Sequence, residues 1–220
     1  MASTPPIFAP PPWNLTGHGF ALLYRFPQDW AQQSGHLAPD QREVLTGRWG
    51  AVMLVDYATS GVGPYQELLC IPGQVEQGGK HRFTISKIYV NTEVSVVNGR
   101  RNWGIAKEQA DFAWIKNKDE QKITVTVNGE VALRARLNPF GIPFPLTTAL
   151  LPLKLHQQLN GQRFETQPTA NGWGRLARLT EMYTNPGLFP DLNRVKPLIG
   201  LCIDRFNMTF PRPETREVER

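Results

Sequence analysis

The sequence of 220 residues contains few of the side chains that usually bind metals. Its two cysteines cannot complete a zinc cluster, and its four histidines show no metal-ligand spacing. The histidines are His18, His36, His81 and His156. Cys70 and Cys202 each lie within an apolar, strand-like run, which is typical of reduced core thiols in a cytoplasmic protein. The sequence therefore predicts no metal site and a cytoplasmic location.

Motifs for organic cofactors are missing as well. Gly17-x-Gly19 and Gly61-x-Gly63 lack the third glycine of a dinucleotide-binding loop, and neither opens a long helical pattern. The sequence also has no Gly-x-Ser-x-Gly elbow of a serine hydrolase. We therefore expect no cofactor and no serine nucleophile of that kind.

Long apolar runs are absent, and this bears on membrane partners. No run approaches the roughly 20 residues that a membrane helix requires, so we expect no contact with a membrane. The beginning of the chain, MASTPPIFAPPPW, lacks the basic start and the apolar stretch of a signal peptide. We expect residues 1–13 to form a proline-stiffened arm on the surface or on a neighbouring subunit, and hence a homo-oligomer.

The net charge of +5 does not come from a basic block. Basic and acidic residues interleave, as in Lys116-Asn117-Lys118-Asp119-Glu120, and no aromatic residues are interleaved with a basic patch. This distribution is typical of a solvated surface of mixed charge. We therefore expect no nucleic-acid partner.

Along the chain, apolar residues recur with a period of two rather than 3.6, which indicates strands. The expected strands are residues 19–26, 49–57, 65–72, 82–90, 122–127, 131–137, 176–183 and 201–210. Asn128-Gly129 between two alternating runs predicts a β-hairpin, because a type I′ turn needs positive φ at both central positions. The strand patterns predict a β-rich α+β fold. Residues 1–220 show no domain boundary, so we expect a single domain.

Helical patterns are scarce by comparison. Residues 28–33 follow Pro27 and are expected to form a short helix, and residues 146–159 form an apolar segment of ambiguous type. The prolines at 139, 143 and 145 argue against a central strand there, because proline cannot donate a hydrogen bond to the sheet.

One lysine stands among apolar and small neighbours within residues 89–112. Trp103, Gly104, Ile105 and Ala106 precede Lys107. Burial disfavours a charged ammonium, and a neutral amine can attack a ketone to form a Schiff base. The competing interpretation is a lysine at a strand edge, whose stem packs while its head reaches water.

Four short motifs around this lysine resemble the acetoacetate decarboxylase family. They are Tyr65-Gln66-Glu67, Tyr89-Val90-Asn91, Gly99-Arg100-Arg101 and Gly104-Ile105-Ala106-Lys107. The resemblance implies that Lys107 is the Schiff-base lysine and that a Gly-Arg turn precedes it. It also implies a closed or cone-shaped antiparallel sheet around an apolar cavity, with few short helices.

Four positions depart from the family's pattern. The family's second lysine and the glutamate after its Gly-Arg pair are replaced by Glu108 and Arg101. Counting without gaps places the family's other catalytic carboxylate at Val52 and its substrate-facing arginine at Gly17. We therefore expect the fold and the lysine to be retained, but acetoacetate not to be decarboxylated efficiently.

The remaining candidate residues surround Lys107 in the sequence or in the resemblance. Glu67 follows Pro64 on an apolar strand, where a carboxylate would act as acid or base in imine formation, or would pair with Arg100 or Arg101. Arg101, and less so Arg100, is a candidate to bind a substrate carboxylate. The candidates for a pocket wall, or for plain core, are Tyr89, Trp103 and Ile105.

These observations leave three hypotheses about function. The first is a lysine-dependent enzyme that acts on a small keto acid or other carbonyl compound through an imine, without metal or cofactor. The second is a non-catalytic, degenerate family member that binds a small ligand in the cavity. The third is a structural oligomer with a filled core.

Overall fold

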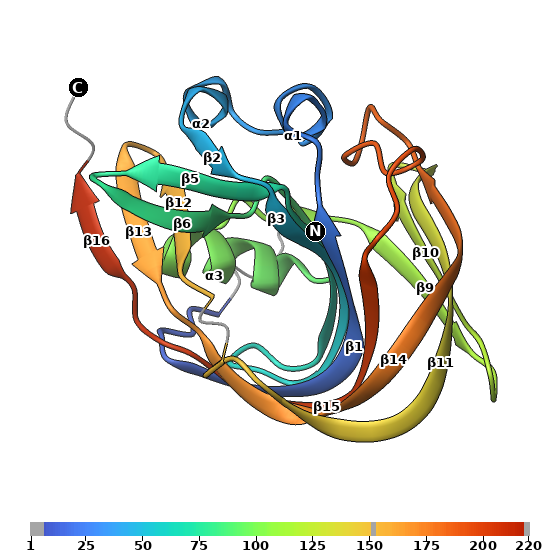
Figure 1. Ribbon diagram of the computed structural model, residues 1–220. Coiled ribbons are helices and arrows are strands. Elements are labelled where there is room, and N and C mark those ends of the chain that lie inside the picture. Colours follow the sequence, from blue (N-terminus) through green and yellow to red (C-terminus); the bar gives the residue numbers. More distant parts are fainter. Residues whose placement is uncertain (1–6, 151–152, 218–220) are drawn as a thin grey trace.

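Strands dominate the computed structural model, which describes residues 7–150 and 153–217 and contains two sheets and three short helices (Figure 1). The larger, ten-stranded sheet is antiparallel except where β8 joins it. Its order is β8 (Glu108–Gln109), β7 (Lys87–Val90), β4 (Tyr65–Ile71), β3 (Trp49–Thr59), β1 (Trp13–Arg25), β15 (Ile199–Phe210), β14 (Thr169–Thr184), β11 (Glu130–Thr147), β10 (Gln121–Val127) and β9 (Asp111–Lys116). The β-rich α+β prediction is confirmed.

The second sheet has six strands and lies across the open side of the first (Figure 1). Its order is β16 (Glu214–Glu217), β13 (Gln162–Thr166), β12 (Leu155–Leu159), β6 (Lys80–Thr84), β5 (Gly73–Gln77) and β2 (Leu45–Gly47). The helices are α1 (Gln28–Ser34), α2 (Pro39–Glu43) and α3 (Glu93–Trp103).

The larger sheet curls so far that its last strand, β9, contacts β1 and β3 in the middle of the sheet. The rings of Phe20 on β1 and Trp114 on β9 stack with their centroids 6.2 Å apart. Lys116 on β9 also donates a hydrogen bond of 3.4 Å to Asp56 on β3. The curled sheet thereby encloses a first apolar core, which includes Leu22 and Leu68.

A second apolar core lies on the other face of β1, β3 and β4. On β4, Leu68 and Cys70 point into the first core, whereas Tyr65 and Leu69 point into the second. Glu67 shares the face of Tyr65 and Leu69, because side chains alternate along a strand. Burial on both faces explains why β4 is almost continuously apolar in sequence.

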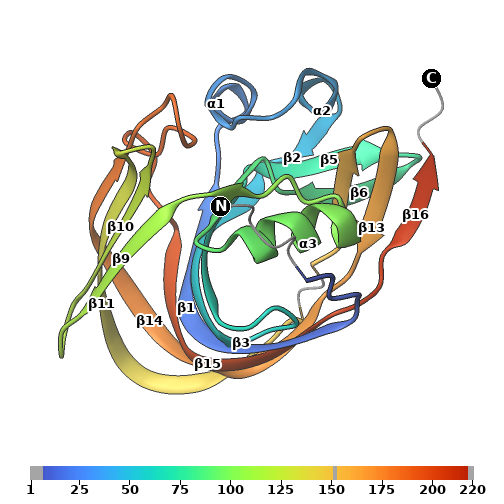
Figure 2. The ribbon, with the colours of Figure 1, turned by 180° about the vertical axis from the view of Figure 1, so that it is seen from behind.

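Helix α3 lies inside the concave side of the larger sheet, below the smaller sheet (Figure 2). The predicted turn at residues 99–101 is therefore wrong, since these residues belong to the helix. Apolar periodicity did not predict this helix, because much of its buried side is small or polar, including Ser95, Asn98 and Asn102. It ends at Gly104, whose φ of 62° is left-handed and suits glycine.

The two buried asparagines of α3 bind the N-terminal arm. Asn98 accepts a hydrogen bond from the backbone N–H of Ala9 at 2.8 Å and donates one to the carbonyl of Ile7. Asn102 donates to the carbonyl of Ala9 at 2.7 Å. The described part of the arm therefore packs on its own chain and gives no support to a homo-oligomer, which stays a prediction; residues 1–6 lie outside the described range.

The remaining strand predictions need three refinements. Residues 82–90 contain β6 and β7 rather than one strand. The ambiguous segment 146–159 contains the end of β11 and the whole of β12, with residues 151–152 outside the described range. The prolines lie within β11, but beyond Leu137 this strand pairs only with β14. Pro139 and Pro145 therefore occupy an edge, where a missing N–H costs little.

Of the two shorter helices, the sequence predicted one. The helix expected at residues 28–33 is present as α1, and α2 was not expected. Within the described residues, no helix has the length and apolar character needed to cross a membrane.

Candidate functional site

Lys107 lies four residues beyond Trp103, the last residue of α3, and is only 4% exposed. Its side chain lies over the helix at Gly99. A Cβ atom placed at Gly99 would lie 2.6 Å from Cδ of Lys107, closer than side-chain carbons approach one another. The glycine therefore provides the space that the lysine stem occupies.

Replacing Gly99 by alanine is expected to push the lysine stem away from the helix. We expect stability to fall by about 1–3 kcal/mol, the usual cost of overpacking. Urea unfolding would measure this loss. The matched control is Val97→Ala on the exposed side of the same helix, which should change stability by no more than about 0.5 kcal/mol; equal losses in both variants would contradict the role of Gly99.

The ammonium of Lys107 contacts three side chains from two elements. Nζ donates to Oε2 of Glu67 at 2.8 Å, to Oγ of Ser95 at 3.2 Å and to the hydroxyl of Tyr65 at 3.4 Å. Ser95 comes from α3, and Glu67 and Tyr65 come from β4. The second core thus contains one buried cation with all three donor positions engaged.

Glu67 is equally buried, with 4% of its surface exposed. Its second oxygen, Oε1, accepts a hydrogen bond of 3.0 Å from the hydroxyl of Tyr57 on β3. The Tyr57 and Tyr65 rings lie 4.6 Å apart and shield the carboxylate. Glu67 is therefore oriented on both oxygens, by a cation on one and by a neutral donor on the other.

The two tyrosines act as neutral hydrogen-bonding groups around this pair. Burial raises the pKa of Tyr57 and of Tyr65 well above the usual value, and the negative charge of Glu67 raises both further. Both hydroxyls consequently keep their protons across the neutral range.

Glu108, which follows Lys107, points away from this cluster. Its Oε1 accepts a hydrogen bond of 2.6 Å from Nζ of Lys87 on β7. Within the described part of the chain, no second cation contacts Nζ of Lys107. Among the described residues, the only charged group bonded to this ammonium is therefore the carboxylate of Glu67.

The two predicted arginines lie on the exposed part of α3. Arg100 donates through Nε to the backbone carbonyl of Lys107 at 2.9 Å. The guanidinium of Arg101 lies 3.7 Å from the ring centroid of Phe8 in the arm. Neither arginine forms an ion pair with Glu67, and their role in binding a substrate stays a prediction.

The three predicted wall residues divide between the two cores. Trp103 and Ile105 lie in the second core, on the side of Glu67. Nε1 of Trp103 donates to the carbonyl of Pro211 at 2.7 Å. Tyr89 lies in the first core, where its hydroxyl donates to the carbonyl of Leu188 at 2.7 Å.

Counting without gaps had put the position of the family's other catalytic carboxylate at Val52, but in the structure Val52 does not lie beside Glu67. Val52 pairs with Cys70 and lies in the first core, on the other face of the sheet from Glu67. Tyr57 is the β3 residue that reaches Glu67. Gly17 lies on β1 between Tyr57 on β3 and Phe206 on β15, whose rings meet edge to face at 5.8 Å.

Sequence reasoning missed Tyr57 and Ser95. Tyr57 is the last residue of the predicted strand 49–57. Its pairing with Tyr65 on the neighbouring strand would have placed it close to Glu67. Ser95 precedes Lys107 by twelve residues and could be linked to it only once α3 was known. Among residues 7–150 and 153–217, no three His, Cys, Asp or Glu side chains gather as a set of metal ligands.

In fold and site, the protein has a curled β-sheet, an internal helix and a buried lysine–glutamate pair. The sequence profile of acetoacetate decarboxylase (ADC) matches residues 3–183, and the chain belongs to this family. Comparison with curated proteins finds no significant match.

Solved structures of the family share this fold at low sequence identity. Acetoacetate decarboxylase from Legionella pneumophila subsp. pneumophila str. Philadelphia 1 is 17% identical, with a TM-score of 0.67 over 98% of this chain and 92% of that chain. The enduracididine biosynthesis enzyme MppR complexed with pyruvate is 14% identical, with a TM-score of 0.66 over 95% and 91%. An acetoacetate decarboxylase-like enzyme from Sphingomonas wittichii RW1 is 11% identical, with a TM-score of 0.61 over 97% and 95%.

Proposed function

We propose that this protein is a lysine-dependent enzyme that forms an imine between Lys107 and a small keto acid or other carbonyl compound. The observation that carries the proposal is the buried contact of 2.8 Å between Nζ of Lys107 and Oε2 of Glu67. An amine and a carboxyl group at hydrogen-bond distance are the nucleophile and the acid–base group that imine formation requires. Family membership and the pyruvate complex of MppR support the choice of substrate class.

The proposed chemistry begins with transfer of one proton from the Lys107 ammonium to Glu67. The neutral amine attacks the carbonyl carbon, and a proton moves from nitrogen to the former carbonyl oxygen to give a carbinolamine. Glu67 then returns its proton to the hydroxyl group, which leaves as water. The product is a protonated imine, whose positive charge lies beside the restored carboxylate.

Tyr57 is a positioning residue in this scheme. Its hydrogen bond to Oε1 orients the carboxyl group so that Oε2 stays directed at Nζ. The protonated imine withdraws electrons from the adjacent carbon, which serves decarboxylation, dehydration or carbon–carbon bond formation. The substrate decides among these outcomes.

Reductive trapping tests the proposal directly. After incubation with pyruvate and a panel of small aldehydes, sodium borohydride should fix an adduct at Lys107 selectively, as mapped by mass spectrometry of the digest. Exposed lysines such as Lys118 serve as internal controls. Lys107→Arg should abolish the adduct, because a guanidinium keeps the charge but forms no imine of this kind.

Two further variants separate the proposed roles. Glu67→Gln should slow trapping by about 10²–10⁴-fold, as expected for loss of a general acid–base group. Tyr57→Phe should slow it less, because the carboxyl group is retained. Trapping spread evenly over exposed lysines, with no enrichment at Lys107, would sink the enzymatic proposal.

That outcome would favour the second candidate, a degenerate family member that binds a ligand without catalysis. The observation on its side is that Lys107 and Glu67 already satisfy each other, while both arginines lie on the exposed part of α3. Such a protein would bind carbonyl compounds without a covalent adduct.

A further inference from the structure

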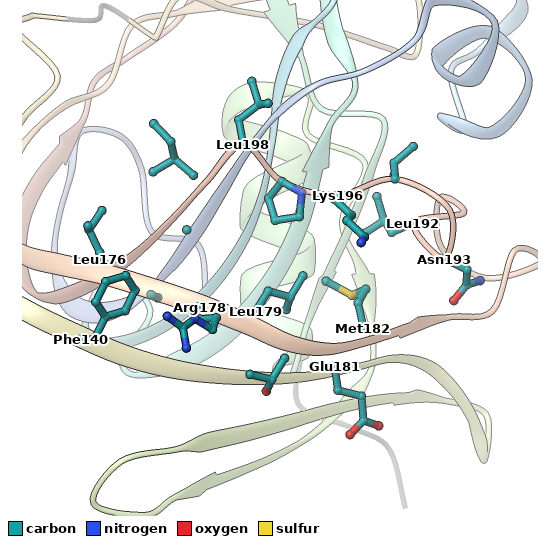
Figure 3. A pocket seen from close by; sticks show the side chains of 16 residues that line it. Phe140, Leu176, Arg178, Leu179, Glu181, Met182, Leu192, Asn193, Lys196 and Leu198 are labelled. Atoms are coloured by element: carbon teal, nitrogen blue, oxygen red, sulfur yellow. The ribbon is translucent and has the colours of Figure 1, made fainter.

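A groove opens where β14 separates from β15, away from the Lys107 site. The two strands pair as far as Leu176 with Leu201, and β14 then continues along β11 to Thr184. Residues 192–200 form the opposite wall, and the groove encloses about 720 Å³ (Figure 3). None of its lining residues forms a hydrogen bond with the side chain of Lys107 or Glu67.

Most of the residues that line the groove are apolar, but polar atoms make up nearly half of its surface. Leu198 is 60% exposed although it borders this concave surface. The apolar side chains that line the groove include Leu176, Leu179, Met182, Leu198 and Ile199. Its volume lies within the range of sites for small organic molecules, and its mixed lining suits a ligand with a polar and an apolar part.

Two cations interrupt the apolar lining, one from each wall. Arg178 lies on β14 and Lys196 on the opposite segment, and Figure 3 shows Leu179 between them in projection. Among the described residues, neither cation forms a salt bridge with a carboxylate. Glu181, which also lines the groove, is paired with Arg136 at 3.2 Å. The groove therefore carries positive charge that no acidic side chain of the described part of the chain neutralises.

The free edge of β14 adds neutral donors to the same wall. From Ala177 to Tyr183, the strand has β11 on one side and no paired strand on the other within the described residues. Alternate backbone N–H groups of an antiparallel strand point to each side. At Thr184 the edge is closed again by the amide of Asn193, which donates to the Thr184 carbonyl and accepts from its N–H.

We propose that this groove binds an apolar anion, with a medium-chain carboxylate as its class of ligand. The carboxylate contacts the two cations and the free N–H groups, and the hydrocarbon chain covers Leu179, Met182 and Leu198. A neutral alcohol of the same length would lose the charge contacts, and an alkylammonium would be repelled. A carboxylate forms no imine, so this site functions independently of Lys107.

Isothermal titration calorimetry of the full chain with decanoate tests the proposal. We expect one saturable site, weakened when the salt concentration rises. Arg178→Gln and Lys196→Gln should each weaken binding by about fivefold, since each removes about one surface ion pair. Leu198→Asp should abolish binding by placing a negative charge on the apolar wall. Lys107→Arg should bind decanoate with unchanged affinity, whether or not imine trapping succeeds.

The matched control is Arg175→Gln, which removes one positive charge from the same strand outside the groove. Arg175 pairs with Asp204 and does not line the groove, so decanoate affinity should not change. Decanol and decyltrimethylammonium should bind at least about tenfold more weakly than decanoate. Equal binding of decanol, or equal weakening by Arg175→Gln and Arg178→Gln, would overturn the proposal.

Discussion

Replacing Lys107 by methionine is expected to lower the free energy of unfolding by about 3–5 kcal/mol, because the substitution leaves a buried carboxylate without its cation. Glu67 is 4% exposed, and its remaining partner would be the neutral hydroxyl of Tyr57. Chemical denaturation followed by circular dichroism measures this change. Lys87→Met is the matched control, because it breaks a more exposed ion pair with Glu108 and should cost at most about 1 kcal/mol.

The double variant Lys107→Met, Glu67→Leu should recover most of the lost stability. A buried ion pair is expensive to desolvate, so its replacement by well-packed apolar side chains is often neutral or stabilising. Recovery would show that the pair is retained for chemistry rather than for the stability of the fold. Additive losses in the double variant would mean that the two charges are not coupled.

Acetoacetate is expected to be a poor substrate even if Lys107 forms imines. Compared side by side with the Legionella pneumophila enzyme, carbon dioxide release should be at least about 10²–10³-fold slower, the effect of losing one electrostatic group at a reacting centre. The structural reasons are specific. Glu108 is bound to Lys87, the β3 residue that reaches Glu67 is Tyr57 rather than a second carboxylate, and the rings of Tyr57 and Phe206 flank Gly17.

Manometry or a coupled assay of carbon dioxide would measure this difference. Trapping of acetoacetate at Lys107 without carbon dioxide release would separate imine formation from decarboxylation. Rapid release that Lys107→Ala abolishes would contradict the prediction, and it would mean that other groups supply the missing electrostatics.

Lys107 and Glu67 could each be picked out from the sequence because each carries a strong local signal, but the sequence left open whether Glu67 serves Lys107 or pairs with Arg100 or Arg101. Glu67 lies in an almost uniformly apolar strand, and Lys107 follows a short run of apolar and small residues. A charged residue in such surroundings requires a partner of opposite charge. The period of two likewise predicted most strands of the larger sheet, since strands such as β10 and the first part of β11 bury one face more than the other.

Helix α3 and the contacts that depend on it could not be predicted in the same way. Its buried residues include Ser95, Asn98 and Asn102, which serve as partners for Lys107 and for the arm rather than as an apolar stripe. Periodicity detects burial only where the buried side chains are apolar. The positions of Arg100 and Arg101 were equally hidden, because they depend on which side of the helix faces solvent.

Helix α3 is hydrogen-bonded both to the segment around Ala9 and to Pro211, and these contacts govern when the site can form during synthesis. Asn98 and Asn102 hold the segment around Ala9, and Trp103 donates to the carbonyl of Pro211. Strand β15, which separates β1 from β14, lies beyond residue 183, where the family profile ends. A nascent chain that has reached that point still lacks the strand joining the two halves of the sheet, so Lys107 acquires its final surroundings only after residues 199–211 have left the ribosome.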